Sequence, residues 1–295
     1  MSSHAHRPIV KPDQTQTGPW STAKLLPPCP ERRSLCLVTS ENQQADGLTT
    51  DVLPHHQSLL DGTDWASLGT ARRDGGFLPA VLSRLLNSDP TVQTRAISEL
   101  EPVCHQNSFY EATLPVALYV AAILDHPATA AVVFDRRPEP ERGYPVRAAL
   151  LDWLGSLAYD ADDECLAIGE RHFNGDYLDD YPEMRTFRDH RPAFYRAVSA
   201  FLSHEDAAVR EAAIVAALPL IEHPALACHR DELGRRVHRL LATSTNRYNR
   251  SRCLDALKNW GCDATALETT ADIAARTRHI HGDDWAGGYM DEPPF

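Results

Sequence analysis

The chain lacks the features that mark membrane and secreted proteins. No apolar run among its 295 residues approaches the roughly 20 residues that span a bilayer, so we expect no membrane segment. The N-terminus has no basic start followed by a long apolar core, since Pro27 and Pro28 follow Leu25 and Leu26 at once, and no signal peptide is predicted. A cytoplasmic location is therefore the expectation.

Cysteine is present without the pattern of a disulfide framework or a zinc cluster. The seven cysteines are odd in number and contain no C-x-x-C pair. Cys104, Cys228 and Cys253 fall on apolar stripes and are predicted to be small core residues. The segment 279–284 (H-I-H-G-D-D) has ligand-type side chains, but it lies in a glycine-rich tail without supporting residues, so we predict no metal there.

Recurrent catalytic motifs are also missing. The sequence contains no H-E-x-x-H, G-x-S-x-G, G-x-G-x-x-G or P-loop pattern. Lysine occurs only at positions 11, 24 and 258 while arginine is abundant, a compositional bias that weakens functional arguments from arginine. We therefore predict a non-enzymatic protein that needs no cofactor.

What the chain does have is an internal repeat. The segment 89–97 (D-P-T-V-Q-T-R-A-I) matches 206–214 (D-A-A-V-R-E-A-A-I) at an offset of 117 residues, which is 206 minus 89. At the same offset Pro102 falls on Pro219. Two apolar sets also coincide with the spacing i, i+4, i+7 and i+8 of one helix face. These sets are Val116, Val120, Ile123 and Leu124 in the first copy, and Leu233, Val237, Leu240 and Leu241 in the second.

Each repeat is predicted to hold two helical hairpins. Asp89 and Asp206 stand where a helix N-cap is needed, and Pro90 occupies the first helical position of one copy. The segment 150–154 matches 253–257 once 134–143, a proline- and charge-rich surface loop, is removed. Because one hairpin cannot bury its apolar face alone, stacked hairpins would share a core. The predicted fold is all-α, an α-solenoid of about four hairpins.

Both copies resemble the HEAT repeat, whose second helix opens with D-x-x-V-R-x-x-A. The second copy matches this pattern fully, the first has Gln93 in place of the arginine, and 146–149 (V-R-A-A) is a partial third match. The resemblance covers residues 77 to 262 and implies a HEAT-like fold, not an activity. The segment 105–115 is similar to the H-Q-x-x-x-Y-E-A-T-x-P segment of actinobacterial HEAT-like proteins, which brings no catalytic role.

The remaining segments flank or interrupt the repeats. Residues 1–60 are rich in Pro, Gln, Ser, Thr and His and are predicted to be a disordered tail. The solenoid is expected over 61–278, with repeat halves 77–155 and 193–262 and a non-repeating acidic insert at 156–190. A helix is expected over 63–73, ended by Gly75 and Gly76, and another from Cys262 to about Arg278. Residues 279–295 are predicted to be a flexible acidic tail.

The acidic insert is the first candidate binding surface. A concentrated negative field beside a curved surface would dock a basic protein partner. A hard cation held by its D-x-x-D-D segment (176–180) is the alternative, but this pattern lacks the Gly and distal Glu of an EF-hand loop, so we predict no metal. The acidic residues, set against Arg171, are Asp160, Asp162, Asp163, Glu164, Glu170, Asp176, Asp179, Asp180 and Glu183.

A second candidate surface joins one hairpin to the next. Ser108 and Glu111 have the S-x-x-E spacing of a helix capping box, which is the favoured structural interpretation. His105, Gln106 and Tyr110 would still offer hydrogen bonds and an aromatic contact to a ligand. We therefore include these three residues with the insert in the predicted partner-binding surface.

A nucleic-acid site is the alternative from another class. HEAT-like DNA alkylation glycosylases use a basic concave face with aromatic and acidic residues, for which Asp152, Trp153 and Trp260 are the candidates. The HEAT-like enzyme deoxyhypusine hydroxylase needs repeated His-Glu pairs to hold two irons. This chain has a single such pair, at 204–205, which cannot build that site. The net charge of −12 would repel nucleic acid. The only strongly basic region consists of Arg230, Arg235, Arg236, Arg239, Arg247, Arg250 and Arg252.

The sequence thus favours a HEAT-like protein-binding module, either a scaffold or an immunity or antitoxin-like protein that docks a basic partner. Its binding surface is expected along the row of second helices and the acidic insert.

Overall fold

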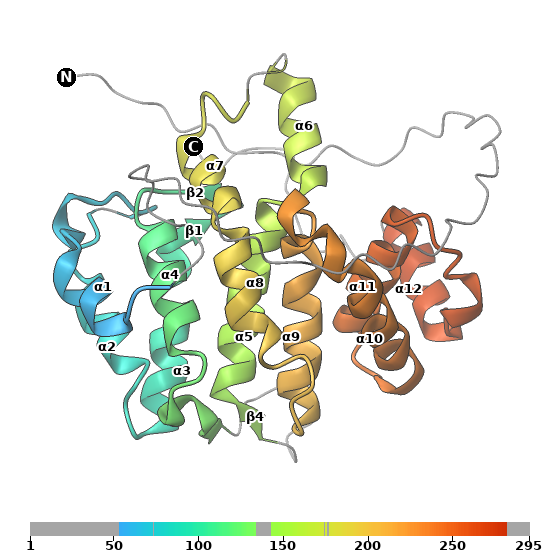
Figure 1. The fold of residues 1–295 in the computed structure, drawn as a ribbon, viewed down its shortest axis with the longest axis horizontal. Helices are drawn as coiled ribbons and strands as arrows, with labels where there is room; N and C mark the ends of the chain where they lie inside the picture. Colours follow the sequence, from blue (N-terminus) through green and yellow to red (C-terminus); the bar gives the residue numbers. More distant parts are fainter. Residues whose placement is uncertain (1–52, 73, 134–142, 174, 176, 282–295) are drawn as a thin grey trace, which may run out of the picture.

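The computed structural model describes residues 53–72, 74–133, 143–173, 175 and 177–281 (Figure 1). These residues are predominantly helical, which confirms the predicted all-α class. The strands in this part of the chain are short antiparallel pairs, β1 (Cys104–His105) with β2 (Ser108–Phe109) and β3 (Val132–Val133) with β4 (Tyr144–Pro145). The second pair flanks the predicted loop, of which residues 134–142 lie outside the described residues.

Helices occupy the repeat positions and pack as consecutive pairs. The contacts join α2 to α3, α4 to α5, α8 to α9 and α10 to α11. In the first repeat the helices are α2 (Leu78–Arg84), α3 (Pro90–Ser98), α4 (Thr113–Ile123) and α5 (Val146–Asp160). In the second they are α8 (Arg191–Ser199), α9 (Ala207–Leu220), α10 (Arg230–Thr243) and α11 (Arg247–Asn259).

The second helices of the pairs lie side by side in one row. Contacts run from α3 to α5, from α5 to α9 and from α9 to α11, while α4 contacts α8 among the first helices (Figure 1). The apolar stripes that defined the repeat supply the core between the helices. Val116, Val120, Ile123 and Leu124 are buried, and so are their counterparts Leu233, Val237, Leu240 and Leu241.

Both predicted N-caps are confirmed. The Asp89 carboxylate accepts the Thr91 amide at 2.8 Å, with Pro90 in the first turn. Asp206 accepts the amides of Ala208 at 2.8 Å and Val209 at 3.1 Å. These bonds satisfy amides that have no partner inside the helix. They fix where α3 and α9, the two helices that open with a D-x-x-V segment, begin.

The two repeats meet through a close contact between α5 and α9. Gly155 is buried in α5, and a Cβ atom placed on it would lie 3.0 Å from the Ala216 Cα and 3.1 Å from its Cβ. Few real Cβ atoms lie this close to a neighbouring backbone, so a side chain here would require α9 to give way. Glycine at 155 therefore allows the row of second helices to continue from one repeat into the other.

One polar position recurs in all four second helices. In α3, α5 and α11 the side chain donates to a backbone carbonyl in the last turn or at the C-cap of the preceding helix, where carbonyls have no intrahelical partner, whereas in α9 it donates to the His204 carbonyl in the loop just before the helix. This position therefore ties each second helix to the segment that precedes it, including α3, where glutamine replaces arginine. The bonds are Gln93 to Leu85 O (2.9 Å), Arg147 to Leu124 O (2.6 Å), Arg210 to His204 O (2.6 Å) and Arg250 to Leu241 O.

The prediction of a helix over 63–73 is wrong. The predicted end of the N-terminal tail, at residue 60, is also too late in the chain. Helix α1 (His56–Gly62) begins before residue 60 and packs against α4. It is followed by the single turn η1 (Trp65–Ser67) and an isolated bridge between Gly69 and Asp74. The buried Trp65 indole donates to the Leu60 carbonyl at 2.9 Å, which folds the chain back at this point. Residues 1–52 lie outside the described residues.

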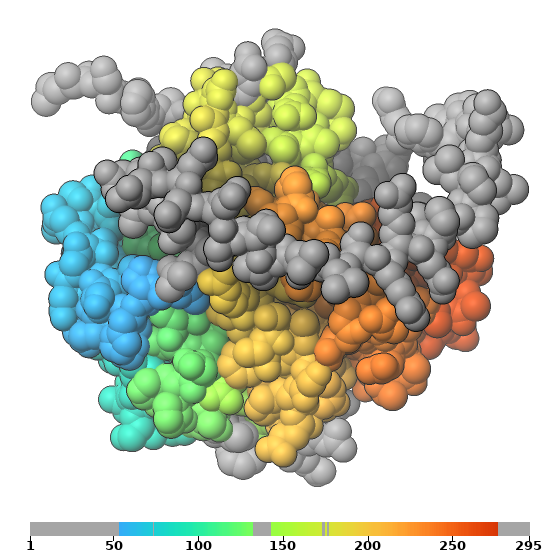
Figure 2. All heavy atoms as spheres, viewed as in Figure 1, coloured from blue at the N-terminus to red at the C-terminus, as the bar shows by residue number. Residues whose placement is uncertain are grey.

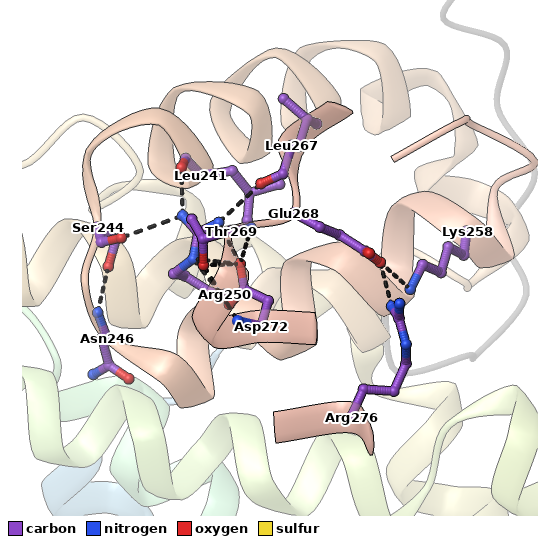
Figure 3. A network of polar contacts seen from close by, with 10 residues as sticks. All are labelled: Leu241, Ser244, Asn246, Arg250, Lys258, Leu267, Glu268, Thr269, Asp272 and Arg276. Carbon is purple, nitrogen blue, oxygen red and sulfur yellow. Dashed lines mark hydrogen bonds and ion pairs between the residues drawn. The ribbon is translucent and has the colours of Figure 1, made fainter. Parts of the chain in front are cut away.

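The expected helix after Cys262 is present as α12 (Thr270–His281), preceded by the turn η5 (Thr265–Leu267). It starts later than expected and runs past residue 278, into the predicted tail. Arg250 of α11 fixes α12, because its guanidinium donates to the Leu267 carbonyl at 2.9 Å and pairs with Asp272 at 2.7 Å (Figure 3). Residues 282–295 lie outside the described part of the chain.

The insert holds the last turn of α5 and two further helices, α6 (Asp163–Phe173) and α7 (Pro182–Asp189). Figure 1 shows both at the upper edge of the molecule, above the rows of repeat helices. Cys253 is buried as predicted, but Cys228 is exposed, because it lies in the turn η4 (Pro224–His229) rather than on a helix stripe. Within the described ranges no helix has the length and apolar character of a bilayer span.

Candidate functional site

Two carboxylates of the insert, Asp163 and Asp179, pair with arginines, so the negative field is weaker than the sequence argument assumed. Asp163 pairs with Arg188 at 2.5 Å and with Arg191 at 3.5 Å, and Asp179 pairs with Arg185. The sequence argument set only Arg171 against the carboxylates and overlooked these arginines of α7 and α8. Their helices fold back onto the insert and bring the cations to it.

The acidic residues of the insert do not converge on one point. Asp162 and Glu164 line a groove against α11, whereas Glu183 lines a different groove against α4. Asp179 and Asp180 are exposed, Asp160 lies beside Cys104, and Asp176 lies outside the described residues. Among the residues with described placement, no group of three or more His, Cys, Asp or Glu is arranged to hold a metal ion.

The capping box predicted at Ser108 and Glu111 is wrong. Ser108 pairs with His105 in a tight hairpin whose two turn residues, Gln106 and Asn107, have φ values of 51° and 61°. Positive φ at both turn positions is the geometry of a type I′ turn. Thr113 organises the start of α4 instead, because its hydroxyl accepts the Tyr110 amide at 2.9 Å and donates to the Val103 carbonyl at 2.6 Å.

This hairpin and the insert meet at Tyr181. The Tyr181 hydroxyl accepts the Phe109 amide and donates to the Phe109 carbonyl at 3.2 Å, while the Phe109 and Phe187 rings lie 5.1 Å apart. Beside the contact is a groove of about 290 Å³ lined by Tyr110, Glu111, Leu114, Pro115, Pro182, Glu183 and Thr186. Tyr110 therefore lines a groove, whereas Gln106 forms the turn and His105 pairs with Glu101.

The larger groove, of about 1150 Å³, runs along the row of second helices. Its walls come from α5, α9 and α11 of that row, from α6 of the insert and from α12. In the space-filling view the yellow-green insert forms the upper edge of the molecule above the yellow to orange helices of the second repeat (Figure 2). We call this groove of about 1150 Å³ the second-helix groove.

An arginine between two tyrosines is the most distinctive feature of the second-helix groove. The Arg252 guanidinium carbon lies 3.9 Å from the centroid of the Tyr159 ring and 5.2 Å from that of Tyr248. Burial raises the pKa of Tyr159 well above its usual range, so the phenol is neutral. The spacing of 248 and 252 on one helix face was available from the sequence, but the contact with residue 159 was not.

Glu222 is a partly buried carboxylate in the wall of the same groove. It accepts the Asp163 amide at 2.9 Å and lies 3.3 Å from the guanidinium of Arg191, whose side chain is 1% exposed. Burial raises the pKa of Glu222 to about 7, and the opposing effect of Arg191 is smaller. Glu222 therefore changes its charge near neutral pH.

We expect Glu222→Gln to flatten the dependence of stability on pH. Because the folded pKa of Glu222 is about 7 and its ordinary value is 4.5, its favourable contribution is full below pH 4.5 and is lost as the pH rises through 7. Between pH 5 and pH 8 the native chain should lose about 2 to 3 kcal/mol more than the variant. Urea denaturation at both pH values measures this difference. Glu170→Gln, an exposed change on α6, is the control, and equal slopes for all three chains would contradict the assignment.

Four of the seven arginines of the basic region are engaged within the chain. Arg250 is buried in its network with Asp272, Arg235 and Arg236 both pair with Glu232, and Arg252 stacks on tyrosines. The residues considered for a glycosylase also separate. Trp260 lines the second-helix groove, but Asp152 accepts the Tyr144 hydroxyl elsewhere and Trp153 packs against the core.

Comparisons with protein-family models, curated proteins and solved structures gave no match to this chain. The functional argument therefore rests on the grooves and on the residues that line them.

Proposed function

We propose that this chain is a HEAT-like α-solenoid that binds a protein partner in the second-helix groove and carries out no catalysis. The packing of four consecutive helix pairs, the row of second helices and the recurring polar side chain at the HEAT-like arginine position support the fold. The observation that carries the function is the groove of about 1150 Å³ along that row, with the insert as one wall.

The composition of this groove suits a polypeptide. It presents charges of both signs over a floor that includes the buried residues Ile168, Leu218 and Leu254, and Tyr248 on its wall is 49% exposed. Tyrosine and arginine are the residues that most often anchor protein interfaces, because they combine a large contact area with directed hydrogen bonds. An extended segment or a helix of a partner would contact all of these groups at once.

The charge of the whole chain supports a basic partner. A net charge of −12 attracts a positively charged protein over the distance set by ionic screening and accelerates their encounter. A cytoplasmic scaffold or an immunity-type protein that masks a basic effector fits these properties. Because Arg235, Arg236 and Arg250 pair with carboxylates of the chain and Arg252 contacts tyrosines, the basic region gives no independent support to nucleic-acid binding.

Site-specific photo-crosslinking in the source cells tests this proposal. A photoreactive phenylalanine at position 248 or 171 should capture the same protein, and the same residue at position 95, on the exposed face of α3, should not. The captured protein, once purified, should bind the native chain and the Arg95→Gln control equally. Its affinity for the Tyr248→Ala variant should be at least tenfold weaker, which calorimetry would measure.

Two results would contradict the proposal. One is the same set of crosslinks from positions 248 and 95. The other is binding of duplex DNA that weakens steeply with salt, because phosphate contacts release counterions and would favour the nucleic-acid alternative.

A further inference from the structure

Arg252 differs from the buried arginines around it in having no anionic partner. Arg191 pairs with Asp163 and Glu222, and Arg250 pairs with Asp272. Arg252 is partly buried, yet within the described part of the chain no carboxylate lies within ion-pair distance of it, and its one hydrogen-bond partner is Tyr248. A guanidinium carries five N–H donors, so most of those of Arg252 are unused.

The acidic residues that share the groove are engaged elsewhere or remain apart. Asp162 accepts the Cys165 amide at 2.7 Å at the start of α6, and Asp255 accepts the Ser251 hydroxyl at 3.4 Å. Glu222 pairs with Arg191, and Glu164 is exposed without an ion pair among the described residues. None of them neutralises Arg252 by direct contact.

A second unused donor lies in the same wall. The Tyr159 hydroxyl is buried and has no hydrogen-bond partner among the described residues, although its ring lies directly under Arg252. A buried hydroxyl without a partner is destabilising. Because its oxygen is covered by protein atoms, an acceptor on a ligand would reach it only after a small shift of the wall.

We propose that Arg252, fixed between Tyr159 and Tyr248, is a carboxylate-binding subsite of the second-helix groove. Contact with both tyrosine rings positions the guanidinium, and the donors that Tyr248 does not take are available for a bidentate contact. The ligand is an acidic side chain or chain terminus of the docked polypeptide, which leans on the exposed face of Tyr248. This inference rests on the proposed function, because it names what the partner presents to the groove.

The shape of the guanidinium, rather than the surrounding charge, favours a carboxylate. The groove carries charges of both signs, with Arg171, Arg247, Lys258 and Arg276 beside its acidic residues. The two coplanar oxygens of a carboxylate match the planar donor edge of a guanidinium.

Nuclear magnetic resonance of the arginine Nε–Hε groups tests the subsite without the partner. N-acetylglutamate α-amide is titrated into the full chain as the side-chain probe, N-acetylglycine as the terminal carboxylate, and N-acetylglutamine α-amide as the neutral control. We expect saturable shifts of the Arg252 Nε–Hε and Tyr248 ring signals with at least one acid, and at least a tenfold weaker response to the neutral amide. The acid that binds more tightly identifies the source of the carboxylate.

Variants separate specific binding from a general effect of charge. Arg252→Gln should abolish the Tyr248 shifts, Arg252→Lys should weaken them because the bidentate contact is lost, and Arg95→Gln should leave them unchanged. Equal shifts of Tyr248 in the native and Arg252→Gln chains, or no shift with either acid, would overturn the subsite. Crosslinking at position 248 with no carboxylate response would retain the proposed function and reject the subsite. A carboxylate response without a crosslinked partner would do the reverse.

Discussion

Replacing Arg250 by methionine is expected to lower the free energy of unfolding by about 3 to 5 kcal/mol, the usual cost of removing one partner of a buried ion pair. The Arg250 and Asp272 side chains are 5% and 8% exposed. The guanidinium also donates to the carbonyls of Leu241, Ser244 at 3.3 Å and Leu267 at 2.9 Å (Figure 3). Without it, these carbonyls lose a donor, and the Asp272 carboxylate keeps only the amide and hydroxyl of Thr269 and no cation.

Chemical denaturation of matched variants measures this effect. Arg235→Met removes a pair whose arginine is 60% exposed, and it should cost no more than about 1 kcal/mol. Adding Asp272→Asn to Arg250→Met should recover part of the loss, because the uncompensated charge is then gone. A loss below about 1 kcal/mol for Arg250→Met would show that the network does not hold α12 to the second repeat.

Acid should reduce the difference between the native chain and Arg250→Met. Hydrogen bonds from Arg250 lower the pKa of Asp272 to about 2 from its ordinary 3.8. A carboxyl whose folded pKa is depressed contributes stability above its ordinary pKa and loses it as the pH falls through the folded value. The stabilisation by this pair is therefore complete at neutral pH and declines below about pH 4.

Gly155→Leu is expected to cost about 3 kcal/mol or more, because the new side chain would meet the backbone of α9. The site has no room, since even the Cβ atom would lie 3.0 Å from the Ala216 Cα. Inserting a bulky group into a packed helix contact forces the helices apart or the side chain off its rotamer. Thermal or urea unfolding of the variant measures the loss.

Gly234→Ala is the matched control for this prediction. Gly234 also lies in a helix, but a Cβ atom there has nothing within 4 Å. Alanine at 234 should stabilise the chain by about 0.5 to 1 kcal/mol by restricting the unfolded state. If Gly155→Leu were tolerated as well as Gly234→Ala, the close contact between α5 and α9 would not be what joins the repeats.

The repeat made much of the helical framework predictable. Its stripes and caps are local patterns, and the structure buries the stripes and forms the caps as expected. Even the role of Arg250 was within reach, because the offset that pairs 150–154 with 253–257 also pairs Arg147 with Arg250. Both donate to the end of the preceding helix. Considering Arg250 only as part of a basic cluster hid this correspondence.

The second-helix groove depended on contacts that no local pattern encodes. Arg252 meets Tyr159 across more than ninety residues of chain, and Asp163 meets Arg188 and Arg191 only because α7 and α8 fold back. The S-x-x-E pattern at Ser108 failed for another reason. The same residues satisfy a two-residue turn, and the Tyr181 hydroxyl, far along the sequence, stabilises that alternative.

The claim that the second-helix groove is the partner-binding surface is tested most directly by hydrogen exchange, measured on the free chain and on its complex with the partner captured at position 248. We predict slower exchange on binding in peptides covering 159–171 and 247–260, with no change in α2 and α3. Slower exchange confined to α2, α3 or the hairpin at 104–109, with the groove peptides unchanged, would contradict the account.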